Sequence, residues 1–128
     1  MLKIRKEQKQ AFARRELEGF QDRMIDHLGA LFPAYCEPLG EPAVRRLIEL
    51  GVERAARHGV VTERGVCVYL DVMFAFGRDF EADPALPWAR AILVDRTING
   101  PLLRADALFE AAFDHLDEAR GLHAQEAS

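Results

Sequence analysis

Apolar residues recur along most of this chain at steps of three and four, the period of a helix that buries one face. The first such stretch runs from about Arg5 to Phe32, and the apolar stripe that defines it consists of Phe12, Phe20, Met24, Leu28, Leu31 and Phe32. Pro33 disfavours helical backbone at the residue before it, so we expect the helix to end there. At 1.5 Å per residue such a helix is about 42 Å long, and its N-terminal turns would extend beyond a core.

A short connector, residues 33–40, and a second long helix follow. Three residues of the connector are expected to point inward, namely Tyr35, Cys36 and Leu39. The second helix is predicted over residues 42–58, since Pro42 suits a first helical position and Gly59 can provide a left-handed cap. Gly51 in its middle weakens the helix unless another helix crosses closely there, and we expect such a crossing.

The third predicted helix begins at the N-cap Thr62 and ends at Gly77. It is apolar on most of its circumference, interrupted mainly by Asp71, and its buried positions are expected to be Val66, Tyr69, Leu70, Met73 and Phe74. A helix that is apolar nearly all round belongs at the centre of a bundle. The β-branched and aromatic residues leave a strand as the alternative for this stretch.

Residues 78–88 show no periodicity and combine acidic residues with prolines and the only tryptophan. They begin like a calcium loop, with the alternating acids Asp79, Glu81 and Asp83. A calcium loop needs glycine at its sixth position and glutamate at its twelfth, and this chain has Pro84 and Arg90 there. We therefore expect no metal site.

Structural roles are the alternative for this loop. We expect Asp83 to set the turn before Pro84, and Asp79 to pair with Arg78 or Arg90. The apolar side chains of the loop would pack it onto the third helix, and they are Phe80, Leu86 and Trp88.

A short fourth helix, Trp88 to Val94, is predicted after Pro87, with Ile92 and Leu93 inward. The last helix starts at Pro101 and ends by Gly121, and its expected buried face consists of Leu102, Ala105, Leu108, Phe109, Ala112, Phe113 and Leu116. The chain is thus predicted to be an all-α bundle of about five helices, a single domain over residues 1–121 with a flexible tail over 122–128.

Length, charge and cysteine content limit the classes of function that we expect for this chain. A length of 128 residues allows one core, and a net charge of −4 makes nucleic acid an unlikely partner. No apolar run is long enough to span a membrane, and the charged start lacks the apolar segment of a signal peptide. Cys36 and Cys67 lie outside any C-x-x-C spacing. We interpret them as reduced thiols of a cytoplasmic protein.

The sequence contains no pattern typical of catalysis. There is no G-x-S-x-G, no phosphate-binding glycine loop and no H-E-x-x-H among its four histidines. We interpret His58 as a surface residue that suits the negative end of its helix. The prediction is a protein that is not an enzyme and has no cofactor.

Charge is distributed unevenly. Residues 1–15 carry six cations and one acid, whereas residues 78–128 carry five arginines and ten acids. The basic end is either a solvated helix terminus or an arm that binds an acidic partner or a second copy of the chain. DNA would require its cations to share one face, and the alternation with Glu7, Glu16 and Glu18 dilutes that face.

Several short stretches resemble a family of small bacterial proteins encoded beside type VI secretion effector and spike genes. They are residues 4–8 (IRKEQ), Phe32-Pro33, 51–55 (GVERA), 76–80 (FGRDF) and 83–89 (DPALPWA). The resemblance implies a cytoplasmic accessory protein, a chaperone or adaptor for an effector. This chain departs from the family in the turn at residues 96–101.

We therefore predict a non-enzymatic protein-binding module, an adaptor or chaperone for a type VI secretion effector or spike component. Its expected contact residues are Asp79, Phe80, Asp83 and Trp88 on the loop, with Arg5, Lys6 and Lys9 on the basic arm. A homodimer through the N-terminal helix is a further expected association. Two alternatives stay open, an immunity protein that neutralises a toxin and a small DNA-associated regulator.

Overall fold

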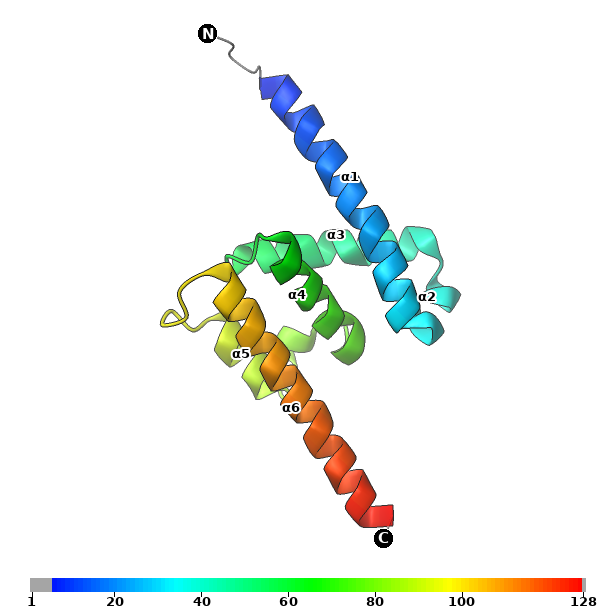
Figure 1. Cartoon of the computed structure of the whole chain (residues 1–128), viewed down its shortest axis with the longest axis vertical. Helices are drawn as coiled ribbons and strands as arrows, with labels where there is room; N and C mark the ends of the chain where they lie inside the picture. Colours follow the sequence, from blue (N-terminus) through cyan, green and yellow to red (C-terminus); the bar gives the residue numbers. More distant parts are fainter. Residues whose placement is uncertain (1–5, 128) are drawn as a thin grey trace. The chain divides into compact units, whose positions relative to one another are not determined.

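The computed structural model describes residues 6–127, and the side chains of residues 16–100 and 103–119 within them. Its elements are α1 (Lys6–Leu31), α2 (Pro33–Leu39), α3 (Glu41–Arg57), α4 (Glu63–Phe76), the 3₁₀ turn η1 (Phe80–Ala82), α5 (Pro87–Leu93) and α6 (Pro101–Ala127) (Figure 1). No strand occurs over this part of the chain, so the all-α prediction is confirmed and the strand alternative for α4 is wrong. The described residues form six α-helices instead of about five because the expected connector forms α2.

The chain groups into two compact units, Met1–Glu49 and Leu50–Ser128, and the boundary between them falls inside α3. The sequence had predicted one domain over residues 1–121 and a tail over 122–128. The backbone of α6 is helical to Ala127, past the expected end at Gly121. The flexibility of the tail stays a prediction.

In the first unit, α1 packs against α2. Leu28 is fully buried, and its carbonyl accepts a hydrogen bond from the Cys36 thiol at 3.6 Å. Cys36 is buried as predicted, but Tyr35 and Leu39 are exposed. Successive side chains of a helix point about 100° apart, so the helical backbone of α2 turns Tyr35 and Leu39 away from the side on which Cys36 lies.

Helix α4 is the centre of the second unit, where it packs against α6 and η1, and α5 packs against the same two elements. The N-cap of α4 is Thr62, whose hydroxyl accepts a hydrogen bond from Gly65 N at 3.0 Å. Side chains around most of its circumference are buried, as predicted, and include Val66, Tyr69, Leu70, Val72, Met73 and Phe74. The position of the cap and the central role of this helix are therefore confirmed.

Gly51 lies where α3 approaches α4. A β-carbon at Gly51 would overlap Cδ2 of Leu70 and lie 3.5 Å from Cε of Met73. Leu70 is fully buried, so its side chain has little room to move away. The close crossing that the sequence predicted at this glycine is confirmed.

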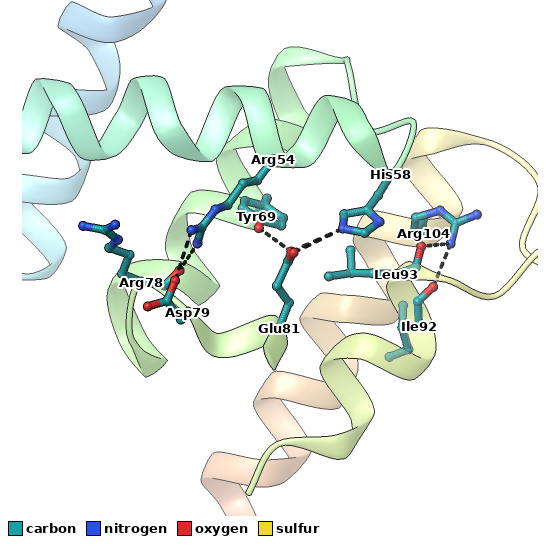
Figure 2. Close-up of polar contacts among 9 residues, drawn as sticks. All are labelled: Arg54, His58, Tyr69, Arg78, Asp79, Glu81, Ile92, Leu93 and Arg104. Atoms are coloured by element: carbon teal, nitrogen blue, oxygen red, sulfur yellow. Dashed lines mark hydrogen bonds and ion pairs between the residues drawn. The ribbon is translucent and has the colours of Figure 1, made fainter. Parts of the chain in front are cut away.

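Arg104 of α6 holds the C-terminal end of α5. Its guanidinium donates hydrogen bonds to the carbonyls of Ile92 at 2.7 Å, Leu93 at 2.8 Å and Ile98 at 3.2 Å, and Figure 2 shows the first two. The last carbonyls of a helix have no partner within the helix. One side chain thus pairs these groups and fixes α5 and the following turn to α6.

None of the helices in the described part of the chain combines the length and the apolar character that crossing a membrane requires. 

The contact at Gly51 gives a prediction with an internal control. Gly51→Ala should lower the free energy of unfolding by about 1 kcal/mol or more, because overpacking at Leu70 outweighs the gain in helix propensity. Gly29→Ala in α1 adds a methyl group with nothing within 4 Å, so it should raise the stability by about 0.5–1 kcal/mol. Urea denaturation of both variants measures the difference. A stabilised Gly51→Ala would show that the helices separate easily here.

Candidate protein-binding surface

The loop between α4 and α5 is packed onto the helix before it. The ring of Phe80 lies 5.1 Å from that of Tyr69 and is 1% exposed, and Leu86 is also buried. Trp88 is partly buried, with its ring 5.4 Å from Phe76. The predicted packing of these three residues is confirmed. The expectation that Phe80 contacts a partner is wrong, because its side chain belongs to the core.

Two of the acids of this loop have fixed partners at its ends. Asp79 pairs with Arg54 of α3 at 3.0 Å, and the same guanidinium donates to the carbonyl of Arg78 at 2.6 Å. The predicted pairing of Asp79 with Arg78 or Arg90 is therefore wrong. Asp83 accepts a hydrogen bond from Ala85 N at 2.9 Å, so its predicted role in the turn is confirmed. The carboxylates of Asp79 and Asp83 thus bind different groups within the chain.

Glu81 is the polar centre of the loop. Its carboxylate accepts a hydrogen bond from the Tyr69 hydroxyl at 2.6 Å and lies 3.3 Å from Nε2 of His58 (Figure 2). His58 had been interpreted as a surface residue, but its side chain is only 20% exposed and faces Glu81. We call Glu81, Tyr69 and His58 the Glu81 trio. Its contacts join the end of α3, the middle of α4 and η1.

Burial, and next the hydrogen bond to Glu81, raise the pKa of Tyr69 well above its ordinary value of 10.0. A phenol with a raised pKa stays protonated, so Tyr69 keeps donating its hydrogen bond to Glu81. One sequence signal for this hydrogen bond was available, because a buried tyrosine hydroxyl needs an acceptor and Glu81 belongs to a loop that packs on α4.

A shallow groove runs beside this corner. Its lining residues are Phe76, Gly77, Asp79, Phe80, Ala82, Asp83 and Pro84. Asp79 and Asp83 thus line the same groove, and their role in partner binding stays a prediction. Trp88 does not line the groove itself but contacts Phe76 at its edge, and its indole nitrogen lies 3.4 Å from Nδ1 of His115 on α6.

Helix α6 carries an apolar surface that the sequence had assigned to the core. Its side chains Ala105, Leu108 and Ala112 are buried, as predicted. Phe109, Phe113 and Leu116 are instead exposed by 51%, 61% and 46%, so their predicted burial is wrong. At about 100° per residue these three side chains are rotated away from Leu108 and share a neighbouring face. We call Phe109, Phe113 and Leu116 the α6 stripe.

The α6 stripe is continuous and has an acidic border. The rings of Phe109 and Phe113 are stacked, with centroids 6.5 Å apart and planes inclined by 23°. On the side away from the buried face, the helical period places Asp106, Glu110 and Asp117 next to the stripe. Apolar spacing alone cannot separate such a stripe from a buried one, since both repeat every three or four residues.

The structure describes only the backbone of the basic arm, and only from Lys6 onward. Arg5 lies outside the described residues. Lys6 and Lys9 lie on the helical backbone of α1, but their side chains fall outside the described part. Their predicted role in partner binding stays a prediction.

The Glu81 trio generates a stability prediction. Tyr69→Phe removes the hydroxyl donor and leaves Glu81 with His58 alone, so the free energy of unfolding should fall by about 1–2 kcal/mol. Chemical denaturation at neutral pH measures this loss. The exposed Tyr35 is the control, and Tyr35→Phe should change stability by less than about 0.5 kcal/mol. Equal effects of the two variants would contradict the role of the buried hydrogen bond.

The raised pKa of Tyr69 also predicts a pH dependence. The folded state keeps the phenol protonated while the unfolded state ionises near 10.0, so stability is complete below that pH and falls above it. Tyr69→Phe should remove up to about 1.4 kcal/mol per pH unit from this fall. Burial likewise raises the pKa of Cys67 from 9.0 to about 11, so Cys67→Ala should flatten the curve from pH 9 upward. Denaturation between pH 8 and 11 separates the two contributions.

Comparisons of the chain with models of known protein families, with curated proteins and with solved structures found no match. 

Proposed function

We propose that this chain is a non-enzymatic protein-binding module and that the α6 stripe is its main contact surface. The observation that carries the proposal is the exposed, stacked pair Phe109 and Phe113 beside Leu116. Aromatic residues are enriched in protein interfaces and among the residues that dominate binding energy. Isolated apolar residues on a surface are ordinary, but a continuous aromatic stripe is typical of a contact site.

The backing of α6 supports this assignment. The neighbouring side of α6 packs on α4 and α5, and Arg104 fixes α5 and the following turn to it through three carbonyls. A surface held in place by its own scaffold loses little conformational entropy on binding. The stripe would therefore be presented to a partner with its rings already ordered.

The acidic border indicates the chemistry of the partner. Asp106, Glu110 and Asp117 would attract a surface that places lysines and arginines beside apolar residues, as a basic amphipathic helix does. The same acids would be repelled by DNA phosphates and by anionic lipids. A basic protein segment is thus favoured over the nucleic acid of the third sequence-based hypothesis.

Within this class, the adaptor or chaperone role for a type VI secretion effector or spike component rests on the resemblance alone and stays a proposal. An immunity protein is the second candidate, favoured by the same acidic surface because many toxins that act on nucleic acids are basic. Co-expression separates the two roles, since an immunity protein rescues cells from the toxin without any secretion.

The test uses the products of genes adjacent to that of this chain, each co-expressed with it and captured through an affinity tag. Phe113→Asp should weaken binding of the retained partner at least tenfold, about 1.4 kcal/mol, because it places a charge in the apolar contact. Leu103→Asp is the matched control, since Leu103 is 60% exposed on the same helix but lies off the stripe. Isothermal titration with the purified partner measures both affinities.

Two outcomes contradict the proposal. One is that no adjacent product is retained. The other is that Phe113→Asp, with an unchanged circular dichroism spectrum and melting temperature, binds as tightly as the unmodified chain.

A further inference from the structure

The N-terminal part of this chain has the chemistry that the α6 stripe would recognise. Residues 1–15, here called the basic segment, carry Glu7 against the cations Lys3, Arg5, Lys6, Lys9, Arg14 and Arg15. From Lys6 onward the backbone of the segment is helical, as part of α1. Helical spacing puts Lys9 and Arg15 three residues on either side of Phe12, an apolar residue between cations.

The described part of α6 has the opposite pattern. Residues 103–119 contain one arginine and the acids Asp106, Glu110, Asp114, Asp117 and Glu118. That arginine, Arg104, is already engaged by three backbone carbonyls. The face around Phe109 and Phe113 is therefore apolar at its centre and acidic at its border, the complement of the pattern around Phe12.

We propose that the basic segment of a second copy of this chain docks on the α6 stripe. The inference rests on the proposed function, because it assigns an occupant to the same surface. The second unit leaves the three side chains of the stripe about half exposed, and the basic segment of a second copy would cover them. A two-fold pair would make the contact twice, once in each direction, as symmetric dimers do.

The lengths of the two surfaces match. Residues 6–15 as helix span about 15 Å, and the step from Phe109 to Leu116 along α6 is about 10 Å. The helical backbone of the segment is therefore long enough to cover the stripe, and its sequence has a cation three residues before and three residues after Phe12. Such a contact combines an apolar seam with flanking ion pairs, as helix pairs in coiled coils do.

Self-docking regulates the binding site. A basic partner has to displace the basic segment, so the surface is covered until a partner that binds more tightly arrives. Because exposed charges are screened by salt, self-association should weaken as the ionic strength rises.

Sedimentation equilibrium of the full chain tests the docking. The unmodified chain should form dimers whose dissociation constant rises at least tenfold between about 0.05 M and about 0.5 M salt. Glu110→Lys with Asp117→Lys should raise the dissociation constant at least tenfold at low salt. Asp114→Lys with Glu118→Lys is the control on the same helix, with the same charge change on the side away from the stripe, and should raise it less than threefold.

Charge exchange makes the test independent of folding. A chain with Lys9→Glu and Arg15→Glu should lose self-association, because its segment and its stripe border are both acidic. Mixing it with the Glu110→Lys, Asp117→Lys chain should restore a mixed dimer, because the acidic segment then faces the basic border and the unmodified basic segment faces the unmodified acidic border. Failure of this mixture to associate, with both chains folded, would overturn the proposal.

Disulfide trapping identifies which copy supplies the segment. Two chains of different tag length, one with Phe12→Cys and one with Phe113→Cys, should give a mixed disulfide dimer on oxidation, above the background of Cys36 and Cys67 in the unmodified pair. If both substitutions in one chain give only an intramolecular disulfide, the segment docks on its own chain and the second-copy proposal is wrong.

The two proposals fail separately. A chain that remains monomeric at low salt, while Phe113→Asp still abolishes capture of the partner, overturns self-docking and leaves the proposed function standing. Dimers that depend on the stripe, with partner capture indifferent to Phe113→Asp, support self-docking and overturn the proposed function.

Discussion

The second unit of this protein depends on one constraint, the need to cover α4 on nearly every side. Its buried residues point in several directions around the helix, among them Val66, Tyr69, Leu70 and Phe74. A surface helix needs one covering neighbour, whereas a helix apolar all round needs several. The close approach of α3 at Gly51, the long contact with α6 and the return of the loop through η1 together meet that need.

Covering α4 also buries polar atoms, which have to be paired. The Tyr69 hydroxyl sits on the central helix, and Glu81 accepts its hydrogen bond from the loop that covers it. Arg54 then reaches from α3 to Asp79 and to the carbonyl of Arg78. Among the described residues, no buried side-chain polar atom lacks a partner. The acids of the loop thus bind groups of the protein itself and hold the loop in place. This structural role explains why a loop that resembles the start of a calcium site occurs here.

Local chemistry made much of this fold predictable from the sequence. The cap at Thr62, the proline that begins α6 and the crossing at Gly51 each depend on properties of one residue and its neighbours. The partner of Asp79 was not predictable in this way, because Arg54 lies 25 positions earlier and is brought near only by the packing of α3 on α4. His58 was misassigned for the same reason, since Glu81 approaches it only when η1 folds back.

The α6 stripe marks the limit of pattern-based prediction, and residue size explains why it lies outside the core. The buried side of α6 carries the small residues Ala105 and Ala112 on either side of Leu108. Small residues let helices approach closely, and a closely packed interface has no volume for a phenylalanine ring. The two phenylalanines would overpack that interface, so they lie beside it with nothing among the described residues to cover more than about half of each ring. The two phenylalanines have the spacing of a buried face because they are large apolar residues suited to an interface. In the proposals above, a basic helix from another molecule covers them.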